Sequence, residues 1–349
     1  MLARVVENVY WLARYLERAE NTARLVNVNT NLLLDLPAGF APGWMLLVDI
    51  SGSREAFDAL DGRAEDASSE RRVVRFLVAE RQNGGSIVSS LKSAHENART
   101  LREVLPSEVS ELLNEFFAEF SRDLANGLNK RTRFDFLKQT VLRLQTLAGQ
   151  LDGTMNRNDA YTFLQIGRNL ERADMTSRIV DVRSAQLLPA DTPELRPFDT
   201  VQWMSVLKSL SGYQMYRLRM RSRVRRADVM HFLLRDDQFP RACGFCFNGI
   251  RDALRALPRS AEVLAQLEDA GRFLGEADLE TLDQAGLHVL VDRLQLRIQG
   301  IHDGIAQSYF PSRDGANGPL LVTRAREQAQ SAAQLQTQAP STGVIAPGL

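Results

Sequence analysis

The sequence predicts an all-α protein, and three observations carry that prediction. Apolar residues recur every three or four positions along most of the 349-residue chain, which is the period of helices that bury one face. We find no sustained alternation of β-branched residues and no Asn-Gly turn joining two such runs, so strand signals are missing. One charged helical stretch also occurs twice. We therefore expect an internally duplicated helical bundle, with two related halves about a pseudo-twofold axis.

Helices are expected in order from the N-terminus. The first runs from about Leu2 to Leu34 and ends before Pro37, because proline and glycine stop helices. Ser86 is a suitable N-cap for a later helix. Further helical segments are predicted from Trp44-Met45, at Ser53 to Leu60, at Val73 to Ala79, at Ile87 to Leu105, from Pro106 onward, and at Phe134 to Leu151.

The repeated stretch is Trp11 to Val28, which reappears 154 positions later as Gln165 to Val182. Weaker echoes follow, such as Trp44-Met45 with Trp203-Met204. The period is too long for a solenoid unit, so we assign residues 1–153 and 154–310 to two related helical halves. Residues 311–349 are rich in Gly, Ala, Gln, Ser, Thr and Pro, and this composition predicts a disordered tail. The residues of the first copy that recur are Arg14, Leu16, Glu17, Arg18, Ala19, Thr22, Arg24, Val26 and Val28.

The first copy has a charged face beside its apolar stripe. Arg14, Glu17 and Arg24 are three or seven residues apart, with Asn21 between the last two, so they share one helix face. Arg18 is expected to point elsewhere, about 100° further round the helix, and Arg172 of the second copy likewise. We expect the charged face to be half buried, with its carboxylates ionised between arginines.

Composition excludes several classes of protein. The formal net charge is zero, so bulk electrostatics do not favour nucleic acid or a membrane surface. The N-terminus lacks the pattern of a signal peptide, and apolar runs fall short of membrane-spanning length. With two cysteines in the chain, we expect a reduced, cytoplasmic protein.

Three motifs resemble the bacterial alpha-E family, an all-helical domain named for its Glu-Arg motif. They are ENVYWLARYLERAENTARL near the N-terminus, HENAR at His95 to Arg99, and FLQIGRNLERADMTSRIVDVR at Phe163 to Arg183. The resemblance covers residues 1–310, and the Glu-Arg motif falls on Glu17-Arg18 and Glu171-Arg172. Members of that family occur beside, or fused to, circularly permuted ATP-grasp proteins and transglutaminase-like proteins. The resemblance therefore implies a part in an ATP-dependent peptide ligation or modification system.

The Glu-Arg faces allow two interpretations. They form either a buried ion-pair network that holds the two halves together, or a cleft that binds an anion or a carboxylate. Catalytic residues cannot be assigned, because glycine-rich phosphate loops and nucleophile elbows are missing from the sequence. The candidate substrate- or partner-binding residues are Arg14, Glu17, Arg18, Arg24, Asn97, Arg99, Arg168, Glu171, Arg172 and Arg178.

Other motifs are given structural interpretations. No metal site and no cofactor are predicted, since none of the four histidines follows a glutamate by three residues, the spacing of ferritin-like sites. Cys243 and Cys246 have the spacing of a redox dithiol, but the βαβ context of thioredoxins is missing, so we interpret them as buried side chains. The arginine-rich run from Arg217 to Arg226 is interpreted as a solvated or partner-contacting segment, because alternate spacing spreads arginines around a helix, and local binding of RNA or a nucleotide is the alternative.

Three hypotheses about function remain. The first is a helical accessory subunit that docks an ATP-grasp ligase, and possibly a transglutaminase-like protein, and presents an anionic peptide through its Glu-Arg faces. The second is an enzyme of the same pathway that uses Glu17 or Glu171 as a general acid or base. The third is a self-associating structural bundle, which makes a homo-oligomer possible.

Overall fold

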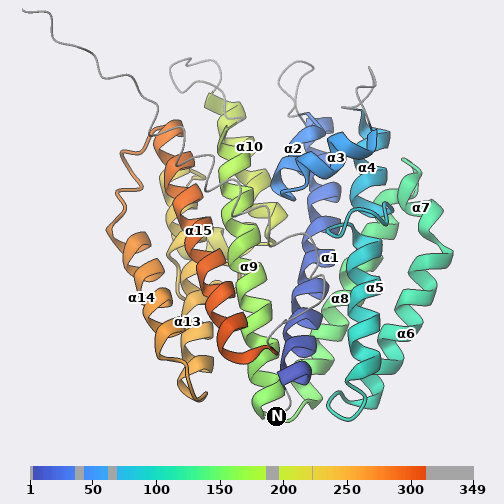
Figure 1. Cartoon of the computed structure of the whole chain (residues 1–349). Helices are drawn as coiled ribbons and strands as arrows, with labels where there is room; N and C mark the ends of the chain where they lie inside the picture. Colours follow the sequence, from blue (N-terminus) through green and yellow to red (C-terminus); the bar gives the residue numbers. More distant parts are fainter. Residues whose placement is uncertain (1–2, 36–42, 62–68, 186–195, 222, 312–349) are drawn as a thin grey trace, which may run out of the picture. The chain divides into compact units, whose positions relative to one another are not determined.

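Two long helices, α1 (Ala3–Asp35) and α9 (Asp159–Ala185), lie side by side in the middle of this computed structural model (Figure 1). The structure describes residues 3–35, 43–61, 69–185, 196–221 and 223–311. Every regular element within those ranges is a helix, which confirms the all-α prediction. Met1–Phe310 form one unit and Pro311–Leu349 a second.

Each central helix has its own flanking helices. α1 packs against α5 (Ile87–Thr100) and α8 (Arg133–Thr154). α9 packs against α13 (Cys243–Arg255) and α15 (Gln284–Tyr309), which lie on the opposite side of the central pair in Figure 1. The first part of the chain is thus built around α1 and the later part around α9.

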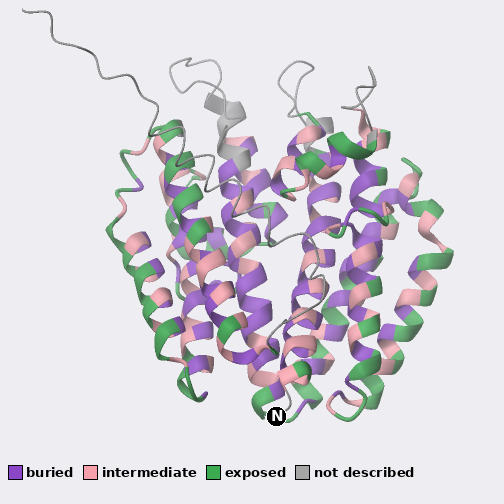
Figure 2. Cartoon of the chain, viewed as in Figure 1, coloured by how far each residue is buried: buried purple, intermediate pink, exposed green. Residues whose placement is uncertain are grey.

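The remaining helices cover these two groups, and the purple inward faces in Figure 2 mark the buried core between neighbouring helices. None of the described helices combines the length and apolar character needed to cross a membrane. The remaining helices are α2 (Met45–Ile50), α3 (Arg54–Asp61), α4 (Glu70–Val78), α6 (Ser107–Arg122), α7 (Leu124–Leu128), α10 (Arg196–Ser209), α11 (Tyr213–Met220), α12 (Arg226–Leu234) and α14 (Ala261–Glu276).

A glycine lets α1 and α9 approach closely. Gly167 of α9 lies against the backbone carbonyl oxygen of Tyr10, where an added Cβ would clash. Side chains that come a few residues after Tyr10 in α1 and after Gly167 in α9 therefore lie within reach of each other.

Most predicted helices are present, with shifted ends. The predicted N-cap is confirmed, since Ser86 Oγ accepts a hydrogen bond of 3.2 Å from the Ser89 backbone N–H. The predicted end of that helix at Leu105 is wrong, because α5 ends at Thr100. Leu101 and Leu105 are buried from a turn, so they continue the apolar spacing without continuing the helix.

The boundary between the predicted halves falls at the last residue of α8, just before a link between helices. α8 ends at Thr154 and α9 begins at Asp159. The assignment of residues 1–153 and 154–310 to two related halves stays a prediction. The predicted tail lies outside the described residues, apart from Pro311.

Candidate functional site

The two Glu-Arg motifs pair with each other across the α1–α9 contact. Arg18 of α1 donates two hydrogen bonds to Glu171 of α9, of 2.6 Å from Nε and 3.0 Å from Nη2. Arg172 of α9 donates to Glu17 of α1, at 2.8 Å from Nε. Each glutamate therefore accepts from the arginine that follows the other glutamate.

This pairing corrects the expectation for Arg18 and Arg172. We expected both to point away from the charged faces, on the basis of the angle between Cα positions. The close approach of α1 and α9 brings the opposite glutamate within reach of each long side chain.

Glu171 is held between two guanidinium groups. Arg14 adds a third hydrogen bond, of 2.6 Å from Nε to Glu171 Oε2. Burial alone would raise the pKa of Glu171, but the charges of Arg18 and Arg14 and their hydrogen bonds outweigh burial and hold the pKa at about 2. Burial also opposes ionisation of Glu17, and there the charges of Arg172 and Arg241 lower the pKa. Both carboxylates are therefore ionised, as expected from the sequence.

Arg241 joins the network from the loop before α13 and was not among the sequence candidates. It donates to Glu17 Oε2 at 3.3 Å, to Asn21 Oδ1 at 2.7 Å and to Glu20 Oε1 at 2.8 Å. In the second copy Met175 stands at the position of Asn21, so this contact has no counterpart there. A search based on the repeat therefore could not find Arg241.

The network is more deeply buried than the predicted half-buried face. The side chains of Glu17 and Glu171 are 5% and 1% exposed, and those of Arg18 and Arg172 are 15% and 16% exposed. A hollow of about 10 Å³ beside Glu17, Glu20 and Arg168 is close to the smallest volume that holds one water molecule. In this conformation the network leaves no room for a peptide in that hollow.

The other predicted residues divide into two groups. Arg24 pairs with Glu20, which also accepts from Arg241, so Arg24 belongs to the network. Arg168 pairs instead with Asp152 at the end of α8, and Arg178 pairs with Asp174.

Asn97 and Arg99 of α5 are not brought to the Glu-Arg network. Asn97 Nδ2 donates a hydrogen bond of 3.3 Å to the Asn8 backbone carbonyl, and the side chain of Arg99 is exposed. Asn97 thus fixes α5 against α1.

A buried tyrosine–histidine pair extends the network. Tyr10 Oη lies 2.7 Å from Nδ1 of His302 on α15, and Arg14 Nη1 donates 3.2 Å to the same Tyr10 oxygen. Burial raises the pKa of Tyr10 to about 12. Tyr10 is therefore a neutral phenol, and its contact with His302 links α15 to the Arg14–Glu171 contact.

Cys243 and Cys246 lie at the start of α13, and both are free and fully buried. Burial raises the pKa of Cys246 to about 12 and that of Cys243 well above its ordinary value. The thiolate is the reactive form of cysteine, so the two residues match the predicted buried side chains.

The arginine-rich run does not form one helical face. α11 ends at Met220, and Arg221 adopts a left-handed conformation with φ of 49°. Within the run, Arg219 forms an ion pair with Asp236, Arg225 forms one with Asp228, and Arg226 donates a hydrogen bond to the Asp283 backbone carbonyl.

A larger groove lies away from the network. It has a volume of about 480 Å³ and is formed by α6, α7 and α8, with Phe116, Phe120 and Phe136 among its lining residues. None of the predicted site residues lines it.

With this geometry, comparison with known proteins identifies the family. Residues 1–310 match the Alpha-E family, described as a predicted alpha-helical domain with a conserved ER motif, and the chain belongs to that family. Of the four Glu-Arg dipeptides in this chain, Glu17-Arg18 and Glu171-Arg172 are the two that lie in the repeated stretch, and the others are Glu70-Arg71 and Glu80-Arg81.

Two curated relatives come from mycobacteria. An uncharacterized protein of Mycobacterium bovis and one of Mycobacterium tuberculosis are each 24% identical to this chain over 321 residues. The match covers 86% of this chain and 35% of each relative. The chain thus spans about a third of the length of these relatives. No solved structure matches the chain.

Proposed function

We propose that this protein is a helical accessory subunit of an ATP-grasp-dependent peptide ligation or modification system. In this role it binds the ligase, and a circularly permuted ATP-grasp protein is the expected partner, with a transglutaminase-like protein as a second. The adenylate or phosphate chemistry then belongs to the partner.

The observation that carries this proposal is that the matching region forms only part of each of the two longer relatives. In the two mycobacterial proteins the matching region makes up 35% of the polypeptide. A domain that forms part of a longer polypeptide in its relatives favours a role in association with other domains or subunits over a role as an isolated enzyme.

Within this proposal, the Glu-Arg network fixes the shape of the subunit. The reciprocal pairs Arg18–Glu171 and Arg172–Glu17 relate α1 to α9 as two copies of one unit would be related, which supports an internal duplication about a pseudo-twofold axis. Buried ion pairs of this kind fix geometry more reliably than they add stability. We infer that the network sets the angle between the two halves, and so the surface that a partner meets.

A second function, binding of an anion, is favoured by the charge of the network. Among the described residues, the network joins five arginines (Arg14, Arg18, Arg24, Arg172 and Arg241) and three glutamates (Glu17, Glu20 and Glu171). The excess of two positive charges would favour a carboxylate or phosphate if α1 and α9 moved apart.

Calorimetric titration with inorganic phosphate and with a glutamate-rich peptide tests this second function. Saturable binding that is weakened in Arg24→Gln, and unchanged in the control Arg255→Gln on the exposed surface of α13, would support it. Heats no larger than those of dilution would exclude it at the concentrations used.

An acid–base enzyme is supported less well. A general acid works best with a pKa near the working pH, whereas the pKa of Glu171 is about 2. Glu171 is therefore suited to the role of a permanently ionised carboxylate, and not to that of a general acid.

Co-expression with a circularly permuted ATP-grasp protein of the same organism tests the main proposal. We expect a complex that survives size-exclusion chromatography and a change in ligase turnover when the helical subunit is added. An unrelated helical protein of similar size serves as the control bait. Absence of both a complex and an effect on turnover would contradict the proposal.

A further inference from the structure

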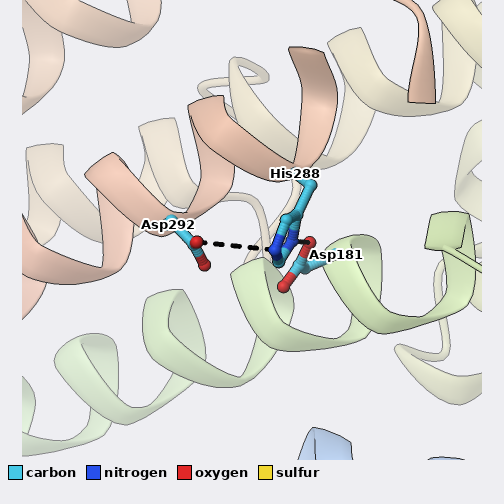
Figure 3. A group of neighbouring side chains, drawn as sticks. All are labelled: Asp181, His288 and Asp292. Atoms are coloured by element: carbon cyan, nitrogen blue, oxygen red, sulfur yellow. Dashed lines mark hydrogen bonds and ion pairs between the residues drawn. The ribbon is translucent and has the colours of Figure 1, made fainter. Parts of the chain in front are cut away.

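A histidine and two aspartates meet where α9 packs against α15, away from the Glu-Arg network. Asp181 comes from α9, and His288 and Asp292 come from α15 (Figure 3). Asp181 Oδ1 lies 2.6 Å from His288 Nδ1, and Asp292 Oδ2 lies 3.5 Å from His288 Nε2. One ligand atom from each residue lies within 4.8 Å of the others. We propose that these three residues bind a divalent first-row transition-metal ion of the zinc class.

The set of donor atoms selects this class of ion. Imidazole nitrogen together with carboxylate oxygen binds zinc and its neighbours, whereas magnesium and calcium prefer oxygen ligands alone. Two carboxylates and a neutral imidazole give the bound divalent ion a net charge of zero. With three protein ligands, such a site keeps positions open for water or another ligand.

Two of the three ligands already have the separation that an ion needs, whereas Asp181 lies at the other ring nitrogen, Nδ1, so the exposed His288 side chain must turn before all three bind one ion. Ligand atoms around a tetrahedral zinc ion, each at about 2.0–2.1 Å from the metal, are roughly 3.4 Å apart. The distance of 3.5 Å between His288 Nε2 and Asp292 Oδ2 already has this value. His288 and Asp292 are four residues apart on α15 and share one helix face, so one helix fixes two of the three ligands.

Exposure differs among the ligands in a way that suits ion entry. The side chain of Asp181 is 9% exposed, whereas those of His288 and Asp292 are each 55% exposed. The buried carboxylate anchors the site on the central helix α9, and the two outer ligands can rotate to admit an ion.

The imidazole occupies the place of a cation between the two carboxylates. A divalent ion bound there would compensate the charges of both carboxylates, including the buried one of Asp181.

Metal titration of the full chain, purified with a chelator and then dialysed, tests this site. We expect one zinc ion per chain, with weaker binding of Mn²⁺ and the weakest of Mg²⁺. His288→Ala should lower the zinc affinity by at least about 100-fold, since changes outside the ligand shell already cost about 10–100-fold. Asp292→Asn should lower it as well.

The matched control is His95→Ala, which removes another partly exposed helical histidine, one that stacks on Phe117 at 4.9 Å. This variant should bind zinc like the wild type. Because His288 and Asp292 are half exposed, their variants should keep the helical circular dichroism of the wild type. Failure to bind zinc, equal affinity for Mg²⁺, or undiminished zinc binding in His288→Ala would each overturn the proposal and leave the three residues as an ion pair between α9 and α15.

Discussion

Glu171 is the residue whose removal should cost the Glu-Arg network most. Its carboxylate is 1% exposed and accepts from both Arg14 and Arg18. Glu171→Gln would leave two buried guanidinium groups without their counterion, and breaking a buried pair in this way costs about 3–5 kcal/mol. Urea unfolding followed by circular dichroism measures this loss.

The control for Glu171→Gln is Glu119→Gln. Glu119 pairs with Arg143 at 2.8 Å, but both side chains are about a third exposed, at 33% and 37%. Exposed pairs contribute at most about 1 kcal/mol. Equal losses in the two variants would contradict the view that burial makes the Glu171 pairs important.

The same carboxylate should make stability depend on acid pH. The pKa of Glu171 is about 2 in the folded protein, against an ordinary value of 4.5. Because the folded state binds this proton more weakly, the stabilisation is complete above the ordinary pKa and is lost as the pH falls toward the folded pKa. The free energy involved is on the order of 3 kcal/mol. The free energy of unfolding should therefore fall less between about pH 5 and about pH 3 in Glu171→Gln than in the wild type, and equal slopes would exclude Glu171 as a source of acid sensitivity.

The sequence could predict part of this network and not the rest. Glu17-Arg18 and Glu171-Arg172 are recognisable because charged residues recur in register, a pattern that surface helices rarely keep by chance. Arg241 has no repeated counterpart, and the ligand Asp181 is 107 positions before His288. Such contacts depend on how helices pack, which local spacing does not encode.

At the scale of elements, periodicity located the helices better than it located their ends. The apolar spacing through Leu91, Ala94 and Ala98 continues to Leu101 and Leu105, yet α5 stops at Thr100. An apolar residue in the pattern indicates only that its side chain is buried. A leucine can be buried from a turn as well as from a helix. The N-cap at Ser86 was predictable because it depends on local hydrogen bonding.

The close contact between α1 and α9 should be sensitive to one methyl group. A Cβ at position 167 would clash with the Tyr10 carbonyl oxygen, which belongs to backbone and cannot rotate away. Gly167→Ala would gain about 1 kcal/mol of helix propensity, but overpacking typically costs about 1–3 kcal/mol. We expect net destabilisation, measured as a lower urea midpoint with an unchanged slope.

Gly149→Ala provides the opposite case. Gly149 lies inside α8, and an added Cβ there meets nothing within 4 Å. This variant should gain about 0.5–1 kcal/mol from helix propensity alone. If Gly167→Ala were also stabilising, α9 would have room to move away from α1, and the close approach would not be a constraint.

At the scale of the whole molecule, the proposed duplication does not produce two independent domains. Tyr10, Ala19 and Ala23 of α1 and Ala173 of α9 are buried, and α1 packs against α9 as well as against α5 and α8. The Glu-Arg pairs also cross between the two helices. Each proposed half would therefore expose an apolar and charged surface if the other unfolded, so neither is expected to be stable alone.

Differential scanning calorimetry of the chain should accordingly show one unfolding transition for residues Met1–Phe310, which form one unit. The calorimetric and van't Hoff enthalpies should agree, as they do in two-state unfolding. Glu171→Gln should move the whole transition to lower temperature and keep it single, because its carboxylate contacts side chains of the opposite half. Two transitions in the wild type, or a split transition in the variant, would mean that residues 1–153 and 154–310 unfold separately and that the Glu-Arg network joins two domains instead of completing one.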